Sequence, residues 1–281
     1  MLDRMTDLAA DLIRSLMILP LQAAGPLDQF EIRTIIPLPA NPSSLDLSVT
    51  NSTLWMAIAF GAIVLFLMAA TRRLSLIPGG MQSVAEVTYE FVAKMVRDAM
   101  GAEGRPFFPY VFTLFLFIFV VNIFGLLPTI PGTPEAFHVF TPTSHIIVTF
   151  ALACLSVGLV LVIGFMKNGL GFLRLFAPAG VPLWLMPLIA PIEVVSFLSR
   201  PVSLAVRLFA NMLAGHIVLK VFAGFVASML SVGGAVAALS ILPLFGMVGV
   251  FLLEILVAFL QAFVFAVLTC IYLQDALHPA H

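Results

Sequence analysis

Arg207 stands in the middle of the apolar segment RPVSLAVRLFANMLAGH, residues 200–216. A charged side chain at the centre of a membrane helix costs about 2.5–3.5 kcal/mol even on the scales derived from insertion experiments. A guanidinium also keeps its proton under all conditions that a protein meets. The residue therefore offers a fixed positive charge, which attracts a carboxylate and repels a passing proton.

Other polar residues share the direction of Arg207. At ~100° per residue along a helix, Ser203, Arg207 and Asn211 fall on one face. Glu193 falls near the same face, although Pro201 between them can rotate the earlier part of the segment. These spacings predict a polar stripe along an otherwise apolar helix.

A second long apolar segment follows, and the glycine pair 233–234 predicts a turn between the two. If the segments fold as an antiparallel hairpin, residues at equal depth have a constant sum of their numbers. The turn then places Gln261 level with Arg207, and Glu254 level with His216. Glu254 and Gln261 are seven residues apart, so they lie on nearly one face of the second segment.

The hairpin thus carries polar groups at three depths. From outside to inside they are His216 and Glu254; Arg207, Asn211 and Gln261; and Glu193 with Asp275 and His278 nearby. Side chains at the outer and inner depths can carry protons, whereas the middle guanidinium cannot release one. We interpret the arrangement as a proton path that a fixed positive charge interrupts.

Each element also has a structural interpretation. Arg207 can extend its charge to the membrane surface, or form an ion pair with Glu193 or Glu254 that stabilises helix packing. His216 and Glu254 can form a buried structural pair. Asn and Gln commonly form hydrogen bonds between helices, and Asn211 and Gln261 can have this structural role alone.

The composition places these residues in a membrane protein. Of the 281 residues, 62% are hydrophobic and 10% are charged, against about 25% charged residues in soluble domains. The apolar runs are long and unbroken, which favours α-helices over a β-barrel.

The net charge of −1 offers no footprint for nucleic acid. Both cysteines lie within apolar runs, and the spacing of residues predicts neither a metal site nor a cofactor.

The fold class predicted is an all-α polytopic membrane protein with about five membrane-embedded helices. The expected spans are Thr53–Ala70, Phe107–Leu127, Ile146–Met166, Val181–Phe225 and Leu242–Leu273. The last two are long, tilted and packed as the hairpin. The fourth exceeds a perpendicular crossing and contains prolines, so it must tilt strongly, break, or do both.

Flanking charges orient the chain. Arg72 and Arg73 follow the first span, and Lys167 follows the third, so both ends face the cytoplasm or its equivalent. The segment MQSVAEVTYEFVAKMVRDAM, residues 81–100, is predicted as an amphipathic helix on that inner surface, with a soluble cap helix as the alternative. Its apolar face is expected to contain Val84, Val87, Phe91 and Met95.

Two domain boundaries follow from the sequence. Residues 1–25 form an N-terminal extension, either retained or removed as a leader near Ala24. Residues 26–281 form a single membrane domain, in which residues 181–275 make the proton-translocating hairpin.

The motifs resemble those of a known family. PVSLAVRLFANMLAGH (201–216) resembles the signature of subunit a of the F-type ATP synthase, the membrane stator subunit beside the rotating c-ring. EILVAFLQAFVFAVLTCIYL (254–273) resembles its last helix, and PLDQFEI (26–32) resembles the start of its bacterial and mitochondrial forms. The resemblance runs from about Pro26 to Pro279, and the segment before Pro26 lies outside it.

The resemblance implies a mechanism. Arg207 is the essential stator arginine, between two aqueous half-channels that lead to and from carboxylates on the c-ring. Glu193, Asn211, His216, Glu254 and Gln261 are the polar channel or interface residues. In some bacterial members the acid and the histidine occupy the reverse of positions 216 and 254. Proton flow drives ring rotation and, in other subunits, ATP synthesis, so the chain is not a catalyst alone.

The resemblance also implies partners and a location. The partners are the c-ring subunits, the b subunits of the peripheral stalk, other subunits of the complex, and lipid. The membrane is an energy-transducing one, and the bacterial inner membrane is favoured over the mitochondrial inner membrane.

Two other classes of protein also place charges in a membrane. A secondary antiporter is expected to repeat its broken helices in both halves of the chain, whereas the charges here gather in the last hundred residues. An intramembrane enzyme needs a paired Asp, a Ser–His pair or a metal set. Glu193 and Glu254 differ too much in depth to form a carboxylate pair.

Overall fold

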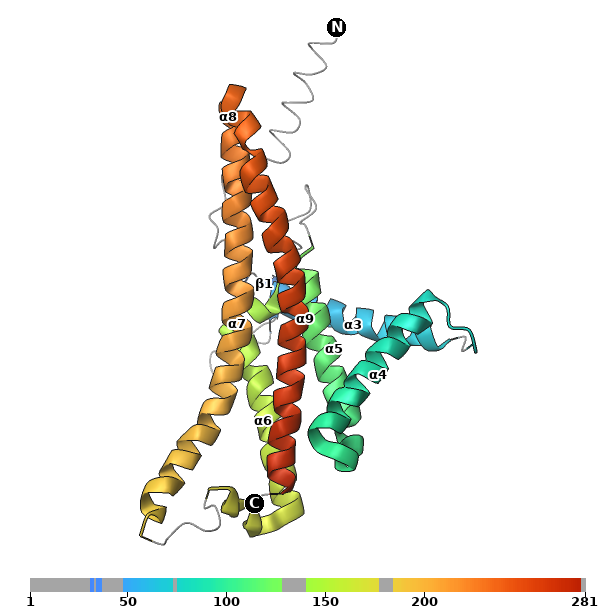
Figure 1. Cartoon of the computed structure of the whole chain (residues 1–281), viewed down its shortest axis with the longest axis vertical. Helices are drawn as coiled ribbons and strands as arrows, with labels where there is room; N and C mark the ends of the chain where they lie inside the picture. The colour runs from blue at the N-terminus through green and yellow to red at the C-terminus, as the bar shows by residue number, and fades with distance from the viewer. Residues whose placement is uncertain are drawn as a thin grey trace. The chain divides into compact units, whose positions relative to one another are not determined.

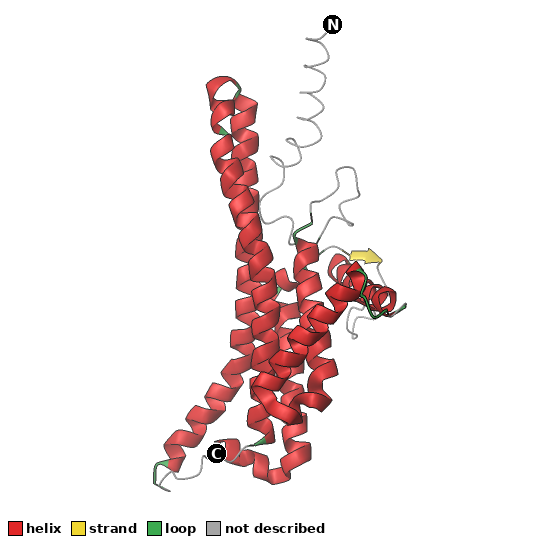
Figure 2. Cartoon of the chain, turned by 45° about the vertical axis from the view of Figure 1, so that its right-hand side comes forward, coloured by secondary structure: helices red, strands yellow, loops and turns green. Residues whose placement is uncertain are grey.

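The computed structural model describes residues 31–32, 34–36, 48–72, 75–127, 140–176 and 184–278. Nearly all of them are helical (Figure 2). The predictions for the leader at residues 1–25 and for Arg73 lie outside the described residues.

The helices follow the order expected from the sequence (Figure 1). They are α3 (Asn51–Thr71), α4 (Gly80–Met100), α5 (Phe108–Gly125), α6 (Ile146–Asn168), α7 (Met186–Val232), α8 (Gly234–Leu239) and α9 (Ile241–Leu277). Short 3₁₀ segments η3 (Gly101–Phe107), η5 (Pro142–Ser144) and η6 (Gly169–Phe176) connect or precede them. Strands β1 (Thr34–Ile36) and β2 (Val49–Thr50) pair antiparallel before α3.

Five helical runs are long and apolar enough to cross a membrane, as predicted. They are Asn51–Thr71, Gly80–Gly125, Ile146–Asn168, Met186–Val232 and Gly234–Leu277. The fold class, an all-α polytopic membrane protein, is confirmed.

The chain divides into two compact units. One comprises Met1–Ala57, Val121–Ser144 and Asn211–Ala258; the other comprises Ile58–Val120, His145–Ala210 and Phe259–His281. Helices α3, α5, α7 and α9 each contribute residues to both. The prediction that residues 26–281 form a single membrane domain stays a prediction.

In the first unit, the end of α7 and the start of α9 lie side by side, joined at the glycine pair (Figures 1 and 2). Gly233 and Gly234 have φ angles of 76° and 61°, a region that only glycine enters without strain. Gly246 on α9 faces Phe222 on α7, where a Cβ would come within 2.6 Å of the ring. The predicted turn and the antiparallel hairpin around it are therefore confirmed.

In the second unit, aromatic side chains join three helices. Phe91 of α4 packs at 5.7 Å from Phe115 of α5 and at 5.5 Å from Phe259 of α9, measured between ring centroids. The Tyr110 hydroxyl of α5 lies 2.9 Å from that of Ser156 on α6. The apolar side chains of these helices thus meet in a packed core as well as forming the outer surface.

Two details refine the predictions. Helix α7 continues through Pro191 and Pro201 without a break. At ~1.5 Å per residue its 47 residues span about 70 Å, so the break is absent from this helix and the strong tilt stays a prediction. On α4, the four residues predicted to share its apolar face differ in burial: Met95 is buried and Phe91 half-buried, whereas Val84 and Val87 are exposed. The buried positions Val92, Met95, Val96 and Met100 follow the next turns of the helix.

Candidate functional site

Arg207 lies on an exposed face of α7. Ser203, Arg207 and Asn211, spaced four residues apart, are all exposed. Leu208 and Met212, on the opposite side, are buried. The shared face predicted from the helical period is present for these three residues, whereas Glu193 is half-buried.

Within the described part of the chain, the Arg207 guanidinium forms neither a hydrogen bond nor an ion pair. One structural interpretation required Arg207 to pair with Glu193 or Glu254, and neither pair is present between these described residues. Asn211, on the same face, likewise makes no hydrogen bond among the described residues. Because most residues of α7 are apolar, Arg207 places a positive charge on an apolar face, and no described residue pairs with that charge.

His216 is buried and is held from outside its own helix. Its Nε2 lies 3.0 Å from Oγ1 of Thr141, a residue just before η5. Only 8% of His216 is exposed. The imidazole is thus fixed at one nitrogen by a hydroxyl that is itself 6% exposed.

Glu254 of α9 contacts α7 at Gly215, the residue before His216. Its carboxylate rests against Gly215, where a Cβ would overlap the carboxylate oxygens. The carboxylate is 3% exposed, and its Oε2 has no hydrogen-bond partner among the described groups. The predicted register, with positions 216 and 254 at one level, is confirmed.

Gln261 lies further along α9 and is also buried, at 8% exposure. None of the hydrogen bonds of the described residues joins it to Arg207. The structure therefore buries the side chain but shows, among the described residues, neither the hydrogen bond between helices of the structural interpretation nor a contact with Arg207.

The inner ends of α7 and α9 carry a different pairing from the one expected. Asp275 accepts a hydrogen bond from Arg200 at 3.2 Å, and the Arg200 guanidinium stacks 4.7 Å from the ring centroid of Tyr272. No described contact joins Asp275 to Glu193. The long side chain of Arg200 reaches the Asp275 carboxylate and compensates its negative charge.

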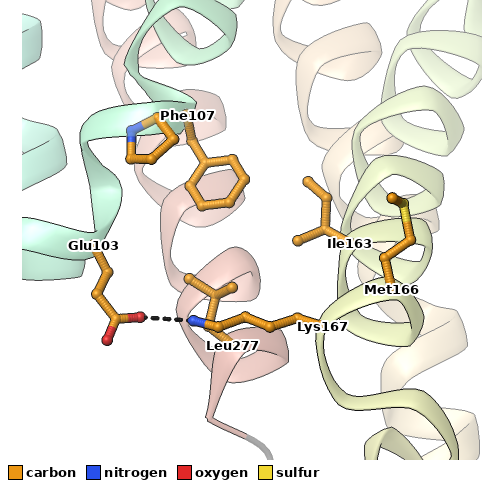
Figure 3. A pocket seen from close by; sticks show the side chains of 7 residues that line it. Glu103, Phe107, Ile163, Met166, Lys167 and Leu277 are labelled. Carbon is orange, nitrogen blue, oxygen red and sulfur yellow. Dashed lines mark hydrogen bonds and ion pairs between the residues drawn. The ribbon is translucent and has the colours of Figure 1, made fainter.

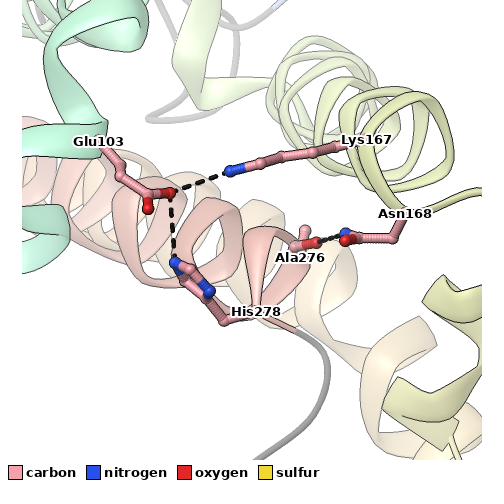
Figure 4. Close-up of polar contacts among 5 residues, drawn as sticks. All are labelled: Glu103, Lys167, Asn168, Ala276 and His278. Carbon is pink, nitrogen blue, oxygen red and sulfur yellow. Dashed lines mark hydrogen bonds and ion pairs between the residues drawn. The ribbon is translucent and has the colours of Figure 1, made fainter.

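His278 was also expected near Glu193, and it lies with Glu103 instead (Figure 4). Glu103 of η3 accepts a bond from Lys167 of α6 at 3.0 Å and lies 3.2 Å from His278 Nε2. The Asn168 amide donates to the backbone carbonyl of Ala276 at 2.7 Å. These contacts anchor the end of α9 to η3 and α6.

A pocket of about 470 Å³ adjoins this cluster (Figure 3). It is lined by Glu103, Pro106, Phe107, Ile163, Met166, Lys167 and Leu277. Its wall is apolar except for the ion pair between Glu103 and Lys167.

Sequence reasoning missed Thr141 and Glu103. Glu103 had a usable signal, because the flanking charges already placed residues 101–106 and Lys167 on one side of the membrane. Thr141 had none, because its contact joins residues 75 positions apart through a segment without regular periodicity.

The fold and these side chains define a class. Apolar helices long enough to cross a membrane enclose buried His216 and Glu254, and one of the helices exposes a charged Arg207. This is a polytopic α-helical membrane protein with ionisable groups inside its membrane-spanning hairpin. Such groups mark ion pathways more often than structural contacts.

Comparison with known proteins identifies the family. The model of the ATP synthase A chain family matches residues 53–274, which include both helices of the hairpin. The chain belongs to this family.

Similar proteins come from bacteria. ATP synthase subunit a of Mesorhizobium japonicum is 57% identical over 256 residues, covering 91% of this chain and 97% of the relative. The same subunit of a Chelativorans species is 57% identical over 259 residues, covering 92% and 100%. That of Agrobacterium fabrum is 54% identical over 259 residues, with the same coverage.

Proposed function

We propose that this chain is the proton-translocating stator subunit of the membrane sector of an F-type ATP synthase. Two half-channels lead protons to and from carboxylates on the c-ring, and Arg207 separates them. The observation that carries the proposal is the exposed guanidinium of Arg207, which has no ionic partner among the described residues. Since an arginine within a membrane is costly, its counter-charge belongs on another subunit.

The outer half-channel ends at His216 and Glu254. Both are buried, and one carboxylate oxygen of Glu254 lacks a partner among the described groups. A buried carboxylate with an unused acceptor is costly if it only holds a structure together. It suits a group that accepts a proton from the outside and passes it on.

Arg207 provides the electrical separation. A proton delivered from the outer side neutralises a carboxylate of the c-ring, which then leaves the face of α7 into lipid. When a carboxylate returns from the other side, the fixed charge of Arg207 favours its ionised form and hence proton release. A guanidinium does not pass a proton itself, so a direct leak between the half-channels is blocked. Asn211 and Gln261 are proposed to line this middle level.

The inner half-channel begins near Glu193, which is half-buried and makes no hydrogen bond within the described residues. Asp275 and His278 are engaged by Arg200 and Glu103. Glu193 is therefore the proposed proton acceptor of the inner half-channel.

The proposal places the chain in a larger assembly. Its partners are the c-ring, the b subunits of the peripheral stalk and the catalytic sector, where ATP forms; the chain itself is a non-catalytic membrane subunit. The bacterial relatives and the five membrane-crossing helices support a bacterial inner membrane.

The test is proton-gradient-driven ATP synthesis in membrane vesicles that contain the complex with Arg207→Ala. Ser203→Ala, on the same exposed face one turn earlier, is the matched control. With assembly verified, Arg207→Ala is expected to abolish synthesis and Ser203→Ala to leave it near wild type. Synthesis near wild type in Arg207→Ala would mean that the residue is structural and the proposal wrong.

A further inference from the structure

Thr141 contacts His216 through a bond that joins two distant parts of the chain. Its Oγ1 lies 3.0 Å from Nε2 of His216, and the two residues are 75 positions apart. Both side chains are buried, at 6% and 8% exposure. A polar contact of this kind between buried groups fixes the position of both partners.

The Thr141 side chain is itself held in place. It packs on Gly125 at the end of α5, where a Cβ would overlap the side chain of Thr141. The Ser144 hydroxyl and backbone amide both donate to the carbonyl of Thr141, at 2.6 and 3.0 Å. The next turn is anchored by Thr143, which donates to Asn122 of α5 at 2.8 Å. Thr141 is thus a rigid support for the imidazole.

A hydroxyl suits an imidazole that changes its protonation. It donates to Nε2 when that nitrogen is bare, and it accepts from Nε2 when the nitrogen carries a proton. The bond therefore persists in either tautomer and either charge state, whereas a carbonyl requires Nε2 to carry a proton and an ammonium group requires it to be bare. The hydrogen bond at one ring nitrogen also sets the orientation of the other.

We propose that Thr141 is a positioning residue for proton transfer: it holds the His216 ring in one orientation in both protonation states, one residue along α7 from Gly215, on which the Glu254 carboxylate rests. Lys220, one turn later on α7, acts electrostatically on His216, and Glu254 of α9 contacts the neighbouring residue Gly215. This inference rests on the proposed function, in which His216 carries protons through the outer half-channel.

The test uses three variants of the whole complex reconstituted in vesicles. Thr141→Val keeps the shape and removes the hydroxyl, whereas Thr141→Ser keeps the hydroxyl. Thr269→Val is the matched control, because Thr269 is fully buried and, among the described residues, its hydroxyl donates only to the Phe265 carbonyl of its own helix. If Thr141→Val does not assemble, Thr141→Cys replaces it, since a thiol is a weak donor of similar size.

Loss of one hydrogen bond of ordinary strength is expected to slow proton-driven ATP synthesis about five-fold in Thr141→Val. The rates of proton-driven ATP synthesis in Thr141→Ser and Thr269→Val are expected to stay within about two-fold of the wild-type rate. Failure of Thr141→Ser to restore the rate would show that volume, and not the hydroxyl, matters, and would overturn the inference.

The second arm combines Thr141→Val with His216→Gln. If Thr141 acts through His216, the double variant is no slower than His216→Gln alone. An additional loss would show that Thr141 acts elsewhere. If His216→Gln alone leaves synthesis at the wild-type rate, the proposed proton path fails and the role of Thr141 with it. If His216→Gln is impaired but Thr141→Val is not, only the inference about Thr141 fails.

Discussion

The carboxylate of Glu254 rests directly on Gly215, so that the backbone of α7 leaves no room for a side chain at that position. The contact joins the two helices of the hairpin one residue before His216. It explains why a glycine stands within a long apolar helix, where it has a conformational cost. In the proposed function, this contact sets the depth of the Glu254 carboxylate relative to His216.

Gly215→Ala is expected to displace Glu254 and to destabilise the hairpin. The added methyl overlaps the carboxylate, and overpacking of this kind costs about 1–3 kcal/mol. Gly224→Ala is the matched control, because a Cβ on Gly224 of the same helix meets nothing within 4 Å. The thermal unfolding temperature of the detergent-solubilised complex and its rate of ATP synthesis should both fall for the first variant only. Equal behaviour of the two variants would contradict the close contact.

The bond between Asn122 and Thr143 is expected to stabilise the segment that carries Thr141. Both residues are fully buried, and the hydroxyl donates to the amide oxygen at 2.8 Å. Asn122→Leu or Thr143→Val leaves a buried partner unsatisfied, which costs about 1–3 kcal/mol. Thermal unfolding of the two single variants and the double variant forms a cycle. The double variant should lose less than the sum of the two; additive losses would show that the bond contributes nothing.

Arg200 is expected to matter more than its ionic partner. Asp275→Asn removes one partly exposed ion pair, which is worth at most about 1 kcal/mol. Arg200→Ala also removes the stacking on Phe197 and Tyr272, at 5.2 and 4.7 Å from their ring centroids. The unfolding temperature should therefore fall further for Arg200→Ala than for Asp275→Asn. The reverse order would mean that the charge pair, and not the aromatic contact, holds the end of α9.

Much of the fold was predictable because membranes restrict the chain strongly. Apolar length locates the helices, and the glycine pair at 233–234 sets both the turn and the register of Gly215 with Glu254. The continuity of α7 through Pro191 and Pro201 was left open by the sequence. In an apolar solvent an unpaired backbone group is so costly that helices continue through prolines which would end them in water.

The polar contacts were less predictable. Arg200 pairs with Asp275, and Glu103 pairs with Lys167 and His278. Long side chains make these contacts with residues that lie at other depths along the helices. A constant sum of residue numbers describes the backbone register and says nothing of that reach. The contact of Thr141 with His216 depends on the path of a connecting segment, which periodicity does not describe.

Passive proton conduction through the complex tests the central claim most directly. With a potential imposed across vesicles and no nucleotide present, the rate of proton entry is measured for wild type, Arg207→Ala and the control Ser203→Ala. If Arg207 is the barrier between two half-channels, its removal raises the leak while Ser203→Ala conducts as wild type does. A leak unchanged in a fully assembled Arg207→Ala complex would contradict the barrier.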